Sequence, residues 1–167
     1  DARHPPSNDD ADFSDVDLSG ASFHLASVYQ SVFSRTTWRA SDLRVAQFYE
    51  SDFVEADMRG ARTVLTTFAA SDCSRLNLSA TLLDRVTMAQ TNLEGLDLSG
   101  ARIERTTFFE TDLTKTSFER ASWDKVVVFK TSLAGLSFAG LSLPFGQMID
   151  VNLEGCDFSD THIANCN

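Results

Sequence analysis

Apolar residues recur at every fifth position of this chain. The pattern is plainest in residues 91–100, where one unit occurs twice: a small or apolar residue, Asn or Asp, Leu, a polar residue and Gly. Carried in frame in both directions, the central position i of this unit runs from Phe13 to Ile163 in 31 copies. These central residues are Leu, Ile, Val, Met, Phe or Trp, except Thr63 and Cys73. An unbroken repeat of this kind predicts a solenoid.

A period of five fits neither an α-helix nor a flat strand. On a helix, steps of five residues would carry the central residues around every side. On a strand, every second central residue would face water. A chain that turns a corner once per unit avoids both problems, because each central residue then points into a tube. The small residues at i−2 predict a second inward position, and seven of the eight glycines lie at i+2, where a turn with positive φ suits glycine.

The side-chain columns indicate how many units complete one coil. A four-sided coil stacks residues that are 20 apart, whereas a three-sided coil would place Arg44 and Arg59 above Tyr29. The four-sided alternative gives a column of similar residues, with Ala69 and Ala89 in its middle. We call this the aromatic column; its large members are Tyr29, Tyr49, Phe109, Phe129 and Ile149. The sequence therefore predicts four walls.

The five-residue unit resembles the repeat of the pentapeptide-repeat proteins, whose consensus is similar to A(D/N)LxG. The resemblance covers residues 11–167. It implies an all-β fold, a right-handed four-sided parallel β-helix of about eight coils at four units per coil. Residues 1–10 are polar and Pro-rich, and we expect them to form an N-terminal arm outside a β-helix domain of residues 11–167. The family implies no common catalytic activity.

Composition narrows the choice of partners. The formal net charge of −10 argues against binding nucleic acid. The sequence has no apolar run of 18 residues, so we expect no membrane span. It begins at Asp1 rather than Met, which leaves open a removed targeting segment or a fragment boundary.

The residue types that carry catalysis are dispersed. The three cysteines, Cys73, Cys156 and Cys166, fall at inward positions and read as small buried residues; the last two lie on opposite walls, too far apart for a disulfide. His4, His24 and His162 form no metal or nucleophile motif. We therefore expect no enzyme activity, no cofactor and no metal.

Two surface patterns remain as candidate sites. The first is the aromatic column together with the neighbouring corner, and it predicts docking of a protein partner or of a second copy. The alternative is that these aromatic residues only pack on one another along the wall. The corner residues beside this wall are apolar in the first coils and become basic at Arg85, Arg105 and Lys125. We call the apolar part the leucine corner: Leu25, Val45 and Leu65.

The second pattern consists of two ladders of aspartates on neighbouring walls. Some pentapeptide-repeat proteins mimic B-form DNA and inhibit DNA gyrase, so the resemblance offers a DNA-mimicking topoisomerase inhibitor as an alternative function. Against it, Asp is simply the consensus residue at position i−1. The ladders comprise Asp12, Asp52, Asp72 and Asp112, and Asp17, Asp57, Asp97 and Asp157.

Taken together, the sequence favours a non-enzymatic binding or scaffold rod that docks one aromatic wall on a protein. The resemblance suggests that such a rod is a subunit attached to a membrane complex in the thylakoid lumen or periplasm. A gyrase inhibitor would instead be located in the cytoplasm.

Overall fold

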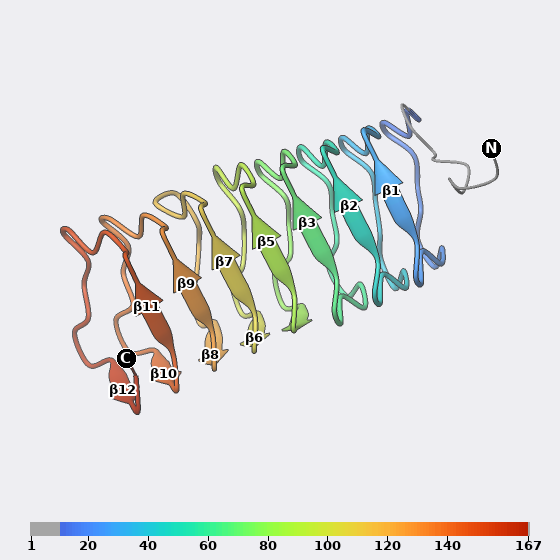
Figure 1. Ribbon diagram of the computed structural model, residues 1–167. Helices are drawn as coiled ribbons and strands as arrows, with labels where there is room; N and C mark the ends of the chain where they lie inside the picture. Colours follow the sequence, from blue (N-terminus) through green and yellow to red (C-terminus); the bar gives the residue numbers. More distant parts are fainter. Residues whose placement is uncertain (1–10, 167) are drawn as a thin grey trace.

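A computed structural model describes residues 11–166, and the arm expected over residues 1–10 lies outside them. The described chain is a parallel β-helix (Figure 1). One wall is a seven-stranded sheet of β1 (Ser27–Tyr29), β2 (Gln47–Tyr49), β3 (Thr67–Ala69), β5 (Thr87–Ala89), β7 (Thr107–Phe109), β9 (Val127–Phe129) and β11 (Gln147–Ile149). A second wall holds β4 (Leu82–Asp84), β6 (Arg102–Glu104), β8 (Ser122–Asp124), β10 (Ser142–Pro144) and β12 (His162–Ala164). Isolated parallel bridges connect the coils on the other two walls.

Every ladder joins residues that are 20 apart. In the seven-stranded sheet Val28 pairs with Phe48, and on the bridged walls Asp12 pairs with Val32 and Asp17 with Thr37. Four such ladders follow one another at intervals of five residues. The prediction of an all-β, four-sided parallel β-helix is therefore confirmed.

The corners are made by tight turns with one left-handed residue. On the two bridged walls the amide of residue i+3 donates to the carbonyl of residue i, as Leu96 does to Leu93 at 3.0 Å. Residue i+2 between them has positive φ, which defines a type II turn; Gly95 has φ 71°. The sequence suggested this conformation only at glycines, yet 23 non-glycine residues between positions 11 and 166 adopt it, including the β-branched Val45 at φ 62°. The inter-coil hydrogen bonds, such as Val45 N to Val64 O at 2.9 Å, hold these residues in place.

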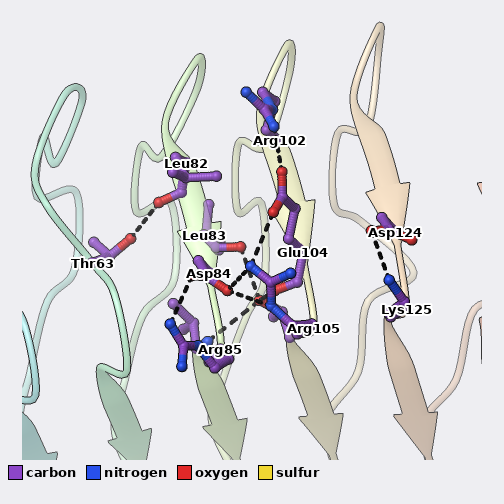
Figure 2. A network of polar contacts seen from close by, with 12 residues as sticks. Thr63, Leu82, Leu83, Asp84, Arg85, Arg102, Glu104, Arg105, Asp124 and Lys125 are labelled. Atoms are coloured by element: carbon purple, nitrogen blue, oxygen red, sulfur yellow. Dashed lines mark hydrogen bonds and ion pairs between the residues drawn. The ribbon is translucent and has the colours of Figure 1, made fainter.

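Central residues fill the tube. Leu93 and Leu98 are 1% and 0% exposed, so successive repeat units do point inward. The two polar exceptions are explained by their surroundings. The Thr63 hydroxyl donates to the carbonyl of Leu82 at 2.8 Å (Figure 2). Burial raises the pKa of the Cys73 thiol, which remains a neutral core residue.

Coverage of the central residues falls at both ends of the described rod. Phe13 is half-buried in the first coil. Leu153 and Ile163 in the last coil are 39% and 53% exposed, because none of the described residues stacks beyond them. The expectation that all central residues are buried therefore holds for the inner coils only.

The two tryptophans differ in one hydrogen bond. Trp38 Nε1 donates to the hydroxyl of Thr36, two residues earlier, at 2.6 Å. Trp123 Nε1 is buried without a partner among the described residues, since the residue two positions earlier is Ala121.

Ala121→Ser is therefore expected to raise the free energy of unfolding by about 1 kcal/mol. Urea denaturation measures it, and Thr36→Ala, the matched control, should lower stability. A loss of stability in Ala121→Ser would contradict this account.

Candidate functional site

The seven-stranded sheet, which we call the aromatic wall, brings the aromatic column together as predicted. Its register pairs Tyr29 with Tyr49 and Phe109 with Phe129, with Ala69 and Ala89 between them. The residues at i−1 and i+1 of each strand point outward, while the central residue is buried in every strand but β11, where Met148 is half-buried. Figure 1 shows the strands stacked along the length of the rod.

The aromatic rings form two stacked pairs. Tyr29 and Tyr49 have ring centroids 5.2 Å apart at 12°, and Phe109 and Phe129 have centroids 5.5 Å apart at 17°. This stacking shields part of each ring, so Tyr49, Phe109 and Phe129 are half-buried. The residues therefore do pack on one another, and they still present ring surface to solvent. Tyr29 and Ile149, at the ends of the column, are 40% and 47% exposed.

The aromatic wall carries no charge. None of the outward residues of its seven strands is Asp, Glu, Lys or Arg. The next corner carries Glu50 and Glu110, which accept hydrogen bonds from Gln30 and Gln90 at 2.9 Å. These bonds run along the rod between adjacent coils. The wall is therefore an apolar and hydroxyl-bearing strip with a polar border.

The leucine corner borders the other side of the aromatic wall. Leu25 is 66% exposed and Leu65 is 43% exposed, and both have positive φ, which turns their side chains away from the core. The column of Ser27, Gln47 and Thr67 separates this corner from the aromatic column. The two apolar stripes predicted from the sequence therefore flank one polar stripe.

Farther along the same corner, the positive charges of Arg85, Arg105 and Lys125 are neutralised by ion pairs with nearby aspartates. Asp84 is nearly buried, and its carboxylate accepts hydrogen bonds from Arg105 Nε at 2.8 Å and from the Arg85 guanidinium at 3.2 Å (Figure 2). Burial raises the pKa of Asp84, but the hydrogen bonds from both guanidinium groups outweigh it, so the pKa is lowered. Lys125 pairs with Asp124 at 3.6 Å. This part of the corner is thus a self-paired network rather than a free basic strip.

The aspartates of the two ladders share one structural role. In all eight, a side-chain oxygen accepts a hydrogen bond from the backbone amide two residues later, as Asp52 does from Val54 at 2.8 Å. Asn77, at the same position between Asp57 and Asp97, accepts the equivalent bond at 3.0 Å. These side chains stabilise the turn as capping groups. The sequence could not distinguish this role from charge presentation.

Hydrogen bonding lowers the pKa of several of these carboxyl groups. The side chain of Ser14, and then its amide, lower the pKa of Asp12. The side chain of Arg59 holds the pKa of Asp57 well below its usual range, and Arg39 adds to this at 3.1 Å. Outside the ladders, the Arg44 side chain is the main cause of the lowered pKa of Asp42.

These shifts predict that acid destabilises the rod. A carboxyl group with a lower pKa in the folded state stabilises it above the unfolded value of 3.8, and that contribution is lost as pH falls through the folded pKa. The melting temperature should therefore be nearly constant from pH 7 to about 5 and fall steeply below about 4. Asp57→Asn, which keeps the turn acceptor but removes the charge, should reduce the acid dependence. An unchanged dependence in this variant would contradict the assignment.

Other candidate chemistry is sparse in the described chain. Cys73 is buried, Cys156 and Cys166 are half-buried, and all three are free. Between residues 11 and 166, no group of His, Cys, Asp and Glu side chains is arranged to hold a metal ion. Within the same range, no helix is long and apolar enough to cross a membrane.

Comparison with known proteins supports the interpretation of the repeat. The sequence model for pentapeptide repeats matches residues 29–62 and 71–108, in eight copies. A comparison with curated proteins finds no match. Among solved structures, a trypsin-treated form of QnrB1, a plasmid-mediated fluoroquinolone resistance protein, aligns with a TM-score of 0.62 at 16% identity, covering 94% of this chain and 79% of that one.

Two further solved structures are less similar. A pentapeptide repeat protein from the Arabidopsis thaliana thylakoid lumen has a TM-score of 0.40 at 20% identity, covering 77% of this chain and 66% of that one. HetL from the cyanobacterium Nostoc sp. strain PCC 7120 has a TM-score of 0.37 at 20% identity, covering 93% and 86%. The chain therefore has the pentapeptide-repeat β-helix fold, and its residues 29–62 and 71–108 match the sequence model of the pentapeptide repeats.

Proposed function

We propose that this protein is a non-enzymatic binding module that docks the aromatic wall on a protein. The observation that carries the proposal is the uncharged, aromatic seven-stranded sheet on a chain with formal charge −10. Although the chain is strongly acidic, the outward positions of this wall hold no charged residue in any of its seven strands. Contiguous apolar surface of this kind usually marks an interaction site, and aromatic residues are enriched in the cores of interfaces.

A rigid rod suits such docking. The aromatic residues are held by the inter-coil ladder and by ring stacking, so binding costs little conformational entropy at those side chains. Leu25 and Leu65 extend the same surface around the corner. Attachment to a membrane complex in the thylakoid lumen or periplasm remains part of this proposal and rests on the family resemblance.

The alternative is a DNA-mimicking inhibitor of DNA gyrase. It is supported by two aspartate ladders on adjacent walls and by a fold shared with QnrB1. The turn-capping role of all eight aspartates weighs against it, because the fold itself already requires an acceptor at these positions. Arg39 and Arg59 also pair with Asp57 and reduce the acidity of that ladder.

The two functions predict opposite results for two variants. Phe109→Glu/Phe129→Glu should abolish retention of proteins captured from the native source on immobilised chain, while Asp97→Asn should retain them. Both variants should keep the β-helix circular dichroism spectrum of the wild type. In a gyrase supercoiling assay, a DNA mimic would show the reverse order of sensitivity. Equal capture by the wild type and the Phe109→Glu/Phe129→Glu variant would contradict the docking proposal.

A further inference from the structure

The middle of the aromatic column, where two alanines adjoin two phenylalanines, is self-complementary in side-chain size. From one end to the other the column reads as two large residues, two alanines and then three large residues: Tyr29, Tyr49, Ala69, Ala89, Phe109, Phe129 and Ile149. The two alanines leave a shallow step between two stacked aromatic pairs. A second copy, turned end for end, can place its Phe109 and Phe129 in this step.

We propose that the occupant of the aromatic wall is a second copy of this chain, packed face to face and antiparallel. The two-fold axis lies in the interface, across the rod between β5 and β7. This inference rests on the proposed function, since it names the partner for the same wall. A two-fold axis parallel to the strands reverses the order of the coils but leaves each column at the same place across the wall. The aromatic column of one copy therefore faces the aromatic column of the other.

The position of the axis follows from side-chain size. With the axis between β5 and β7, Ala89 lies opposite Phe109 and Ala69 opposite Phe129, while Tyr49 lies opposite Ile149. A shift of the axis onto β5 places Ala89 on itself and leaves a void. A shift onto β7 places Phe109 on itself, which holds the walls apart. The proposed register therefore places an alanine opposite a phenylalanine at the four central strand positions and leaves the large–large contact of Tyr49 with Ile149 at the two ends.

Neighbouring columns partly favour and partly oppose the same register, and at the corner it places Arg85 opposite Arg105. In the i−1 column Thr87 lies opposite Thr107, and Thr67 lies opposite Val127, so hydroxyl and methyl groups face each other. At the leucine corner Val45 lies opposite Phe145, which is 49% exposed. The polar border on the other side places acidic Glu50 and Asp150 opposite each other, so charge repulsion opposes association there.

The size of the contact predicts a weak dimer. Six rungs at about 4.8 Å, about 16 Å wide with the corners, bury on the order of 1,000 Å² in total. That value is at the lower limit for a specific interface, so we expect a dissociation constant of about 1–100 μM. Because both copies are acidic, the dimer should become tighter as salt is raised from low concentration.

Sedimentation equilibrium of the full chain and three variants tests the register. Ala89→Phe should weaken the dimer at least tenfold, because the added ring meets Phe109 of the second copy. Phe109→Ala alone should also weaken it, by leaving a void. The double variant Ala89→Phe/Phe109→Ala exchanges large and small residues and should restore most of the affinity. Circular dichroism checks that all variants remain folded.

Each result decides between the proposals. Loss in both single variants and recovery in the double variant support the antiparallel dimer. Additive loss in the double variant overturns the register, and a wild-type chain that is monomeric at 500 μM overturns the dimer. A different experiment tests the docking proposal: it is overturned if the Phe109→Glu/Phe129→Glu variant captures other proteins as well as the wild type does.

Discussion

Phe48→Ala is expected to lower the free energy of unfolding by about 3–5 kcal/mol, the largest effect of any single substitution considered. Phe48 is 0% exposed and its ring stacks on Phe68 at 5.4 Å. It also meets Phe53 edge to face at 5.0 Å, so removal of the ring leaves a cavity that spans neighbouring coils. Urea denaturation followed by circular dichroism measures the loss.

The matched control for this prediction is the next residue. Tyr49 belongs to the same strand but points outward, so Tyr49→Ala should cost about 1 kcal/mol or less. Equal effects of Phe48→Ala and Tyr49→Ala would contradict the inward position of the central residue.

Deletion of residues 91–95 is expected to separate the aromatic wall into two parts while the β-helix still folds. One repeat unit makes one wall, so its removal keeps every central residue inward but rotates all later residues by one wall. Phe109 and Phe129 then lie on a different wall from Ala69 and Ala89. Self-association should fall at least tenfold, as measured by sedimentation equilibrium, and partner capture should be lost.

Deletion of residues 31–50 is the control, because it removes one complete coil. It places Tyr29 directly beside Ala69 on the same wall and keeps Ala89 opposite Phe109 in the proposed dimer. This variant should fold and associate nearly as well as the wild type. If the two deletions had the same effect on association, the link between the 20-residue register and binding would be wrong.

The sequence predicted the fold well because one feature dominates it. The five-residue period determines which residues point inward, and stacking at intervals of 20 places Tyr29 beside Tyr49 as observed. Local preference would have failed at the corners. Val45 has a left-handed conformation that β-branched residues avoid, and it is imposed by hydrogen bonds to the next coil rather than by its own preference.

The candidate site was only partly predictable. The membership of the aromatic column followed from the period, but its two stacked pairs and the step at Ala69 and Ala89 depend on side-chain packing. The aspartates read as a charge ladder, and their turn-capping bonds depend on side-chain direction. Likewise, the pairing of Arg105 with Asp84 joins adjacent coils, and a basic corner was expected instead.

Hydroxyl-radical footprinting in the free and assembled states tests most directly whether the aromatic wall is the interaction surface. On assembly, with a second copy or a captured partner, the account predicts protection of Tyr49, Phe109 and Phe129. Val16, an inward residue left accessible in the first coil, and Leu82, an outward residue on another wall, are 40% and 41% exposed and should keep their labelling rates. Protection of Val16 or Leu82 with unchanged labelling of the aromatic column would contradict the account.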